Sequence, residues 1–311
     1  MWKAIIAAAV LLAGTAAAQA PPPAAVRPYV EALAAAALFL PGGSAKTLSL
    51  VNYDDASHRA LQRAAFTAAV LGGGIAPTAH LDARGSLLPT AASWHERRYL
   101  LSAEQRCAVQ VNVGDVEAGL AAAVPFHAAF SVWHELAHCQ LQELLSAGGV
   151  DDLPAQLAAA LPPAHSDLVY SVFSESYADS LALLVQAAWR GNGAAREMAA
   201  GAQRFRHEEQ GGHDTGVALG HLLQLLDRYD LSALTPRDRA VLAMNLAVEA
   251  TVDWAQVRAG ASLRALLQTL EGRLLPAIAA AAAAPRTAAA LPAYLVFPAP
   301  GQPPRIALEQ D

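Results

Sequence analysis

The chain has 311 residues, of which 54% are hydrophobic and 15% are charged. A sequence of this length and composition can bury one large core or two modest ones, which excludes an intrinsically disordered protein. The formal charge is −6, with 27 acidic and 21 basic residues mixed along the chain, so no nucleic-acid partner is expected.

The first 18 residues predict an export signal. Lys3 provides a short positive start, an apolar run follows at 4–12, and alanines at 16–18 offer a small-residue cleavage site. We expect cleavage after Ala18, because cleavage after Ala20 would leave Pro21 directly behind the cut. The alternative is a retained membrane anchor, but the apolar run is shorter than the about 20 residues that span a bilayer. The mature protein is therefore expected in the periplasm or outside the cell, with no stable membrane insertion.

The N-terminal half predicts a mixture of helices and strands. The clearest strand signal is the alternation of apolar and polar residues at 107–113, which is typical of a half-buried strand. The segment 75–105 has no regular pattern and is expected to be loop with local structure. The other expected elements are a helix at 28–40, a short strand at 47–53 and a helix at 55–71.

The C-terminal half predicts helices. Ser166 is expected to cap a helix at 166–190. Thr235 is expected to cap a helix at 236–258, with Pro236 in its first turn. An Ala/Pro-rich tail at 276–311 is expected to be extended or poorly ordered. The fold class is thus mainly α, of the α+β kind, with 19–275 as a single domain. The expected helices span 126–146, 166–190, 194–210, 216–229, 236–258 and 261–274.

The first of these helices contains the sequence His134-Glu135-Leu136-Ala137-His138. Residues four apart share one face of a helix, so His134 and His138 can bind one metal ion together. Glu135 then lies beside the open coordination position, where a carboxylate can take a proton from an attacking water. This predicts a site for one Zn²⁺ ion with Glu135 as general base. The alternative is two histidines satisfied within a core.

The second helix carries two carboxylates, Glu175 and Asp179, in a stretch that is otherwise uncharged from 168 to 189. They are again four residues apart, so one can bind the metal while the other accepts a proton from a ligand imidazole. An unpaired carboxylate buried in such a helix would be costly. The alternative is that both side chains face solvent.

The pair of motifs, His-Glu-x-x-His followed by Glu-x-x-x-Asp, resembles that of the gluzincins, which are zincin metallopeptidases with glutamate as third zinc ligand. The resemblance covers two helices, about a sixth of the chain. It implies that His134, His138 and Glu175 bind zinc, that Glu135 is the base, and that Asp179 is the partner of His134. It also implies a zincin-like core, with a small sheet next to the metal helix.

In zincins a strand before the metal helix lines the cleft, and its edge pairs with an extended peptide substrate. The strand at 107–113 is expected to take this place. The loop between the motifs is longer than in thermolysin, and the transmembrane helices of the heat-shock and prenyl-protein membrane peptidases are missing, so the exact family stays open. Leu144 stands where a metzincin would need its third histidine, which excludes that class.

Gluzincins also use a histidine or tyrosine to steady the oxyanion of the tetrahedral intermediate. His213 is the expected group, because it follows two glycines and precedes Asp214 and Thr215, either of which can cap a helix at 216. His221 is the competing candidate. His127 is expected to pack rather than bind, since two helical turns place it about 10 Å from the metal. The groups at 95–96 and 207–209 are expected to be solvated charge clusters.

The two cysteines, Cys107 and Cys139, would meet an oxidising compartment after export. A disulfide between them would fix the strand at 107–113 to the zinc helix. Two reduced, buried thiols are the alternative.

The expected function is that of an exported zinc metallopeptidase, which hydrolyses peptide or protein substrates with water activated by Glu135. The alternative is a non-catalytic zinc-containing helical scaffold, or a degenerate peptidase that binds peptides or partner proteins. A structural zinc site is normally closed by four protein ligands, whereas this sequence predicts three.

Overall fold

The structure is a computed structural model that describes residues 32, 47–51, 91–95, 107–112, 127–150, 152–208, 213–260, 262–283, 294–297 and 305–307. In the strands, and at a few helical positions such as Cys139, only the backbone is described. The predicted signal at 1–18 and the predicted helix at 55–71 lie outside these ranges. So does the predicted helix at 28–40, except for Ala32, which is helical.

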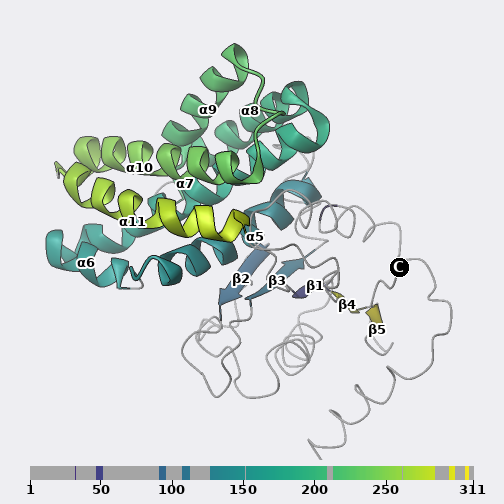
Figure 1. Cartoon of the computed structure of the whole chain (residues 1–311), viewed down its shortest axis with the longest axis horizontal. Helices are drawn as coiled ribbons and strands as arrows, with labels where there is room; N and C mark the ends of the chain where they lie inside the picture. Colours follow the sequence, from purple (N-terminus) through teal and green to yellow (C-terminus); the bar gives the residue numbers. More distant parts are fainter. Residues whose placement is uncertain are drawn as a thin grey trace, which may run out of the picture.

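The C-terminal half is helical, as predicted (Figure 1). None of the described helices combines the length and the apolar composition that a membrane span requires. The helices are α5 (His127–Ala147), α6 (Leu153–Ala160), α7 (Pro163–Arg190), α8 (Asn192–Glu208), α9 (Gly216–Arg228), α10 (Pro236–Ala259) and α11 (Arg264–Ala283).

The helix at the centre of this half is α7, whose residues 176–187 are all buried. A helix buried on every side needs apolar residues all round, which explains the near absence of charge that the sequence shows here. It packs most extensively against α10 and α5 and also contacts α6, α8 and α9. Any charged side chain on this part of α7 therefore has to find its partner inside the protein.

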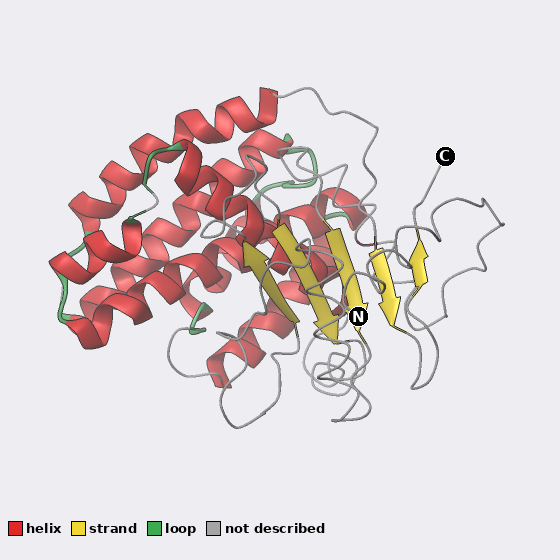
Figure 2. Ribbon diagram, turned by 90° about the horizontal axis from the view of Figure 1, so that it is seen from below, coloured by secondary structure: helices red, strands yellow, loops and turns green. Residues whose placement is uncertain are grey.

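A five-stranded sheet lies beside the helices (Figure 2). Its strand order is β2-β3-β1-β4-β5. The strand β3 pairs with β1 in parallel and with β2 in antiparallel orientation, and α5 contacts β2 and β3. The strands are β1 (Thr47–Val51), β2 (Ala91–His95), β3 (Cys107–Asn112), β4 (Tyr294–Phe297) and β5 (Arg305–Ala307).

The strand order corrects one expectation about substrate binding. Both edges of β3 are occupied by neighbouring strands, so the segment at 107–113 cannot offer a free edge to a peptide. The edge next to α5 belongs to β2, which lies in the segment 75–105 that we expected to be loop. The sequence of β2, Ala-Ala-Ser-Trp-His, does not alternate between apolar and polar residues, and so gives no strand signal.

The start of α7 also differs from the prediction. The helix begins at Pro163, with Pro162 as N-cap, so Ser166 lies inside it and does not cap it. Proline in the first turn needs no hydrogen-bond partner for its nitrogen, and it therefore suits this position better than the serine further on. The prediction that Thr235 caps α10 is confirmed, because its side chain accepts a hydrogen bond from the backbone nitrogen of Asp238.

The first part of the predicted tail, up to Ala283, is helical and not extended or poorly ordered as we expected. The helix α11 continues through Pro276 to Ala283, and β4 and β5 bring two later segments into the sheet. Pro276 removes one helical hydrogen bond, but Leu274, Ala277 and Ile278 are buried. Burial of this apolar face offsets the loss, and the alanines that follow favour a helix.

The packing of α11 on α5 can be tested at Gly148, which follows α5. A Cβ atom at this position would lie 3.0 Å from Cδ2 of Leu274 and 3.3 Å from the carbonyl oxygen of Arg273, both in α11. We expect Gly148→Ala to lower the free energy of unfolding by about 1–3 kcal/mol through overpacking. The control is Gly272→Ala, inside α11, where a Cβ meets nothing within 4 Å. That change should stabilise the protein by about 0.5–1 kcal/mol. Urea denaturation of the two variants measures both effects, and equal effects would contradict the packing.

Candidate metal centre

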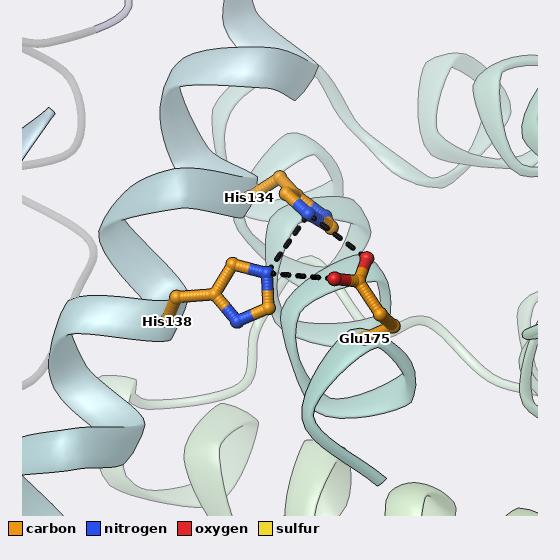
Figure 3. A group of neighbouring side chains, drawn as sticks. All are labelled: His134, His138 and Glu175. Carbon is orange, nitrogen blue, oxygen red and sulfur yellow. Dashed lines mark hydrogen bonds and ion pairs between the residues drawn. The ribbon is translucent and has the colours of Figure 1, made fainter. Parts of the chain in front are cut away.

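Two helices supply the three side chains of the cluster in Figure 3. His134 and His138 come from successive turns of α5, and Glu175 comes from α7. Pairs of contacting residues show that the two helices are antiparallel, since His134 contacts Asp179 and, further along α5, Gln142 contacts Tyr170. The motif residues of α5 and α7 therefore meet at one level of the helix pair.

The three side chains bring their donor atoms to one point. Nε2 of His134 lies 3.0 Å from Nε2 of His138 and 3.3 Å from Oε2 of Glu175, and Nε2 of His138 lies 3.4 Å from Oε1 of Glu175. Donors on a tetrahedral zinc ion, bound at about 2.0–2.1 Å, are about 3.3–3.4 Å apart. The group formed by His134, His138 and Glu175 could thus hold a metal ion.

The other ring nitrogens of both histidines are already engaged. Nδ1 of His134 donates to Oδ1 of Asp179 at 2.7 Å, and Nδ1 of His138 hydrogen bonds with Oγ of Ser174 at 3.0 Å. A neutral imidazole that donates from Nδ1 presents a lone pair at Nε2. Two such lone pairs and a carboxylate facing one point repel each other unless a cation or a proton lies between them. The donor set therefore fits a metal ion.

Asp179, next to this cluster, is held by short hydrogen bonds, and its side chain has no exposure to solvent. Besides His134, it accepts hydrogen bonds from Nε and Nη2 of Arg206 at 3.0 and 3.1 Å, and from Oγ1 of Thr215 at 2.7 Å. Burial by itself would raise the pKa of Asp179, but the charge of Arg206 and the hydrogen bond from His134 hold that pKa well below its usual range. Asp179 is thus ionised and fixed in place.

The charges of the cluster act on one another. Burial alone would lower the pKa of His134, but the charge of Glu175 and the hydrogen bond to Asp179 outweigh it and raise the pKa of His134 to about 10. Burial alone would raise the pKa of Glu175. The charge of His134, together with hydrogen bonds from His134 and His138, outweighs burial and holds the pKa of Glu175 well below its usual range. In the metal-free protein, a proton on His134 occupies the place that a cation would take.

The two candidates for oxyanion stabilisation are placed differently. His213 lies three residues before the start of α9, its side chain is 58% exposed, and its Nδ1 lies 3.3 Å from Oε2 of Glu175. His221 lies inside α9 and is partly buried. The contacts described for the cluster include His213 but not His221. Thr215 is the N-cap of α9, yet its side chain does not cap the helix, because the hydroxyl donates to Asp179 instead.

Two further polar side chains, Arg206 and Ser174, belong to the site, although the sequence patterns did not single them out. Arg206 is buried, and its Nη2 also lies 3.4 Å from Oε2 of Glu175. A signal for it existed in the sequence. The buried face of α8 carries Ala195, Ala199 and Ala202, and Arg206 continues this stripe at helical spacing. A charged residue on an apolar stripe requires a buried partner, which α7 provides.

The remaining candidates are only partly described. Glu135 is buried and directly follows His134 on α5. The side chains of His127, His207 and both cysteines lie outside the described ones, so the disulfide between Cys107 and Cys139 stays a prediction. The side chains of the segment 95–96 also lie outside the described ones, so its expected role as a charge cluster stays a prediction.

Comparison of the chain with models of protein families, with curated proteins and with solved structures finds no match. The interpretation of the cluster therefore depends on its own geometry and chemistry.

The contribution of Arg206 can be measured against an exposed arginine on the same helix. Arg206→Gln removes the buried guanidinium that contacts both Asp179 and Glu175, so that the protonated His134 is left facing two carboxylates, which should lower the free energy of unfolding by about 3–5 kcal/mol. Arg196 forms an exposed ion pair with Asp227 at 2.7 Å, and Arg196→Gln should cost at most about 1 kcal/mol. Denaturation of chelator-treated protein compares the two variants. Equal costs would show that Arg206 does not stabilise the cluster.

The raised pKa of His134 predicts a pH dependence for the metal-free protein. The folded protein holds a proton on His134 up to about pH 10, whereas an unfolded histidine loses it near 6.5. The stabilisation is therefore complete below pH 6.5 and is lost as the pH rises through about 10. Urea denaturation of chelator-treated protein should show falling stability from pH 6.5 to 9, and His134→Asn should flatten this fall. A stability that rises over this interval in the parent and not in the variant would contradict the prediction.

Proposed function

We propose that the protein is an exported zinc metallopeptidase of the gluzincin type, which hydrolyses peptide bonds in peptide or protein substrates. The observation that carries the proposal is the convergence of Nε2 of His134, Nε2 of His138 and the carboxylate of Glu175 at separations of 3.0–3.4 Å, next to a buried glutamate in the helix.

Zinc is the metal that this donor set favours. Two imidazoles and one carboxylate make up the protein ligands of many catalytic zinc sites, whereas calcium and magnesium prefer oxygen ligands alone. Among the described residues, the group of possible ligands has three members. Three protein ligands leave a coordination position open for water or substrate, which is the arrangement of a catalytic rather than a structural site.

A bound zinc ion would lower the pKa of water to about 7 and polarise the carbonyl of the substrate. The residues of the chain then have distinct tasks. Glu135 accepts a proton from the attacking water and passes it to the leaving amine. Asp179 keeps the proton of His134 on Nδ1, so that Nε2 is available as a ligand. His213, at the exposed edge of the cluster, donates a hydrogen bond to the oxygen on which negative charge develops.

We also propose a zincin-like core around the cluster. The metal helix α5 contacts β2 and β3, and β2 lies at the edge of the described sheet. An extended peptide can pair with such an edge through backbone hydrogen bonds. We therefore assign the role of substrate-pairing strand to β2 in place of the segment at 107–113.

The predicted signal at 1–18 supports export to the periplasm or the medium. A compartment of this kind would allow a disulfide between Cys107 and Cys139. The peptidase would then act on peptides or proteins outside the cytoplasm.

The alternative of a non-catalytic zinc protein is weaker because of Glu135. A structural site has no task for a glutamate buried directly beside its ligands. The two functions can be told apart by measurement. Only the peptidase hydrolyses peptides, and only the peptidase needs the carboxylate of Glu135.

The decisive variant is Glu135→Gln, which keeps the shape of the side chain but cannot accept the proton. We expect zinc content to stay at one ion per chain, while zinc-dependent cleavage of a peptide library falls by about 10²–10⁴-fold. Glu143→Gln, two helical turns further along α5, is the matched control and should retain activity. Full activity of Glu135→Gln would refute the mechanism. Stoichiometric zinc without any cleavage by the parent protein would favour the scaffold.

A further inference from the structure

The side chains of residues 213–215 contact two helices, α7 and α10. Nδ1 of His213 lies 3.3 Å from Oε2 of Glu175 in α7. Oδ2 of Asp214 lies 2.6 Å from Nη2 of Arg258 in the last turn of α10. The hydroxyl of Thr215 donates to Asp179 in α7 at 2.7 Å. Each of these consecutive side chains therefore joins the start of α9 to another part of the protein.

His213 depends on its neighbours for its position. Its side chain is 58% exposed, so core packing does not hold the imidazole. Thr215, by contrast, is fully buried, and its backbone nitrogen donates to the carbonyl oxygen of His213 at 2.9 Å. The backbone of His213 is thus tied to an anchored residue two positions further on. Asp214 lies between these two residues, and its ion pair with Arg258 is a further described contact that holds the turn.

Arg258 is well placed to hold Asp214. It belongs to α10, the helix that packs most extensively on α7, and its guanidinium carbon lies 5.6 Å from the ring centroid of Trp254, which is buried. A cation near an aromatic face loses part of its freedom to move. The ion pair is partly buried, since 18% of the Asp214 side chain and 47% of the Arg258 side chain are accessible.

We propose that Arg258 is a positioning residue for His213. Through Asp214 it fixes the turn at 213–215, and with Thr215 it holds the imidazole of His213 beside Glu175 at the edge of the metal cluster. This inference rests on the proposed function, in which His213 acts on the substrate oxygen. Arg258 has no described contact with His134, His138 or Glu175, so its effect on the reaction passes through Asp214.

Another exposed ion pair of α10 provides the matched control. Nη1 of Arg264 lies 2.9 Å from Oε1 of Glu249, and this pair joins α11 to α10 without a described contact to the cluster. Arg264→Gln removes one positive charge from the surface of the protein, as Arg258→Gln does. Arg264→Gln therefore separates a general effect of charge or stability from the positioning of His213.

The kinetic test uses the zinc-loaded protein and a cleaved peptide substrate. We expect Arg258→Gln to lower kcat on the order of 10-fold, because a small displacement of a catalytic group is enough for such a loss. KM and zinc content should change by less than about twofold, and Arg258→Lys should restore most of the activity, since it keeps the charge. Arg264→Gln should be unaffected. In a His213→Gln background, Arg258→Gln should have no further effect, because both changes remove the same interaction.

A second measurement does not depend on hydrolysis. In protein loaded with Co²⁺, paramagnetic relaxation of the His213 ring protons reports their distance from the metal. In Arg258→Gln the imidazole should occupy several positions, so the relaxation rate of its ring protons should fall or become heterogeneous. Arg264→Gln should leave this relaxation rate unchanged. Unchanged relaxation in Arg258→Gln would overturn the inference, whatever the activity does. Altered relaxation in a protein that cleaves no peptide would support the positioning by Arg258 and refute the proposed function.

Discussion

The carboxylate of Asp179 has no access to solvent, so it needs hydrogen-bond partners inside the protein. The other parts of the candidate metal centre are arranged around this requirement. Asp179 lies on the most buried stretch of α7, where an unpaired charge would be strongly destabilising. Its partners come from three other parts of the chain, namely His134 from α5, Arg206 from α8 and Thr215 at the start of α9. Satisfying this one group thus fixes the relative positions of four helices.

The same network prepares the site for a cation. Arg206 contacts both Asp179 and Glu175, so one positive charge is shared by two carboxylates, and the remaining negative charge faces the two Nε2 atoms. The hydrogen bond from Nδ1 of His134 leaves its Nε2 directed at the same point. Because these groups are held by buried contacts, their donor atoms are preorganised, and a metal ion that bound there would require little rearrangement of the chain.

The sequence predicted the group that could hold a metal ion better than it predicted the surroundings of this group. The spacing of His134, His138, Glu175 and Asp179 is local to two helices, and a helix converts spacing directly into a shared face. Arg206 and Thr215 reach the site only through tertiary packing, so no local pattern reveals their partners. The edge strand β2 and the continuation of α11 through Pro276 were missed for a similar reason, since pairing and burial overrode weak local signals.

The central claim is that His134, His138 and Glu175 bind one zinc ion and leave a coordination position open. X-ray absorption spectroscopy of the zinc-loaded protein tests it most directly, because the method counts nitrogen and oxygen neighbours and identifies imidazole. We expect two imidazole nitrogens and oxygen neighbours at about 2.0–2.2 Å, with one imidazole lost in His138→Ala and one oxygen exchangeable with solvent. A sulfur neighbour, a third imidazole or a shell of oxygens alone would contradict the claim.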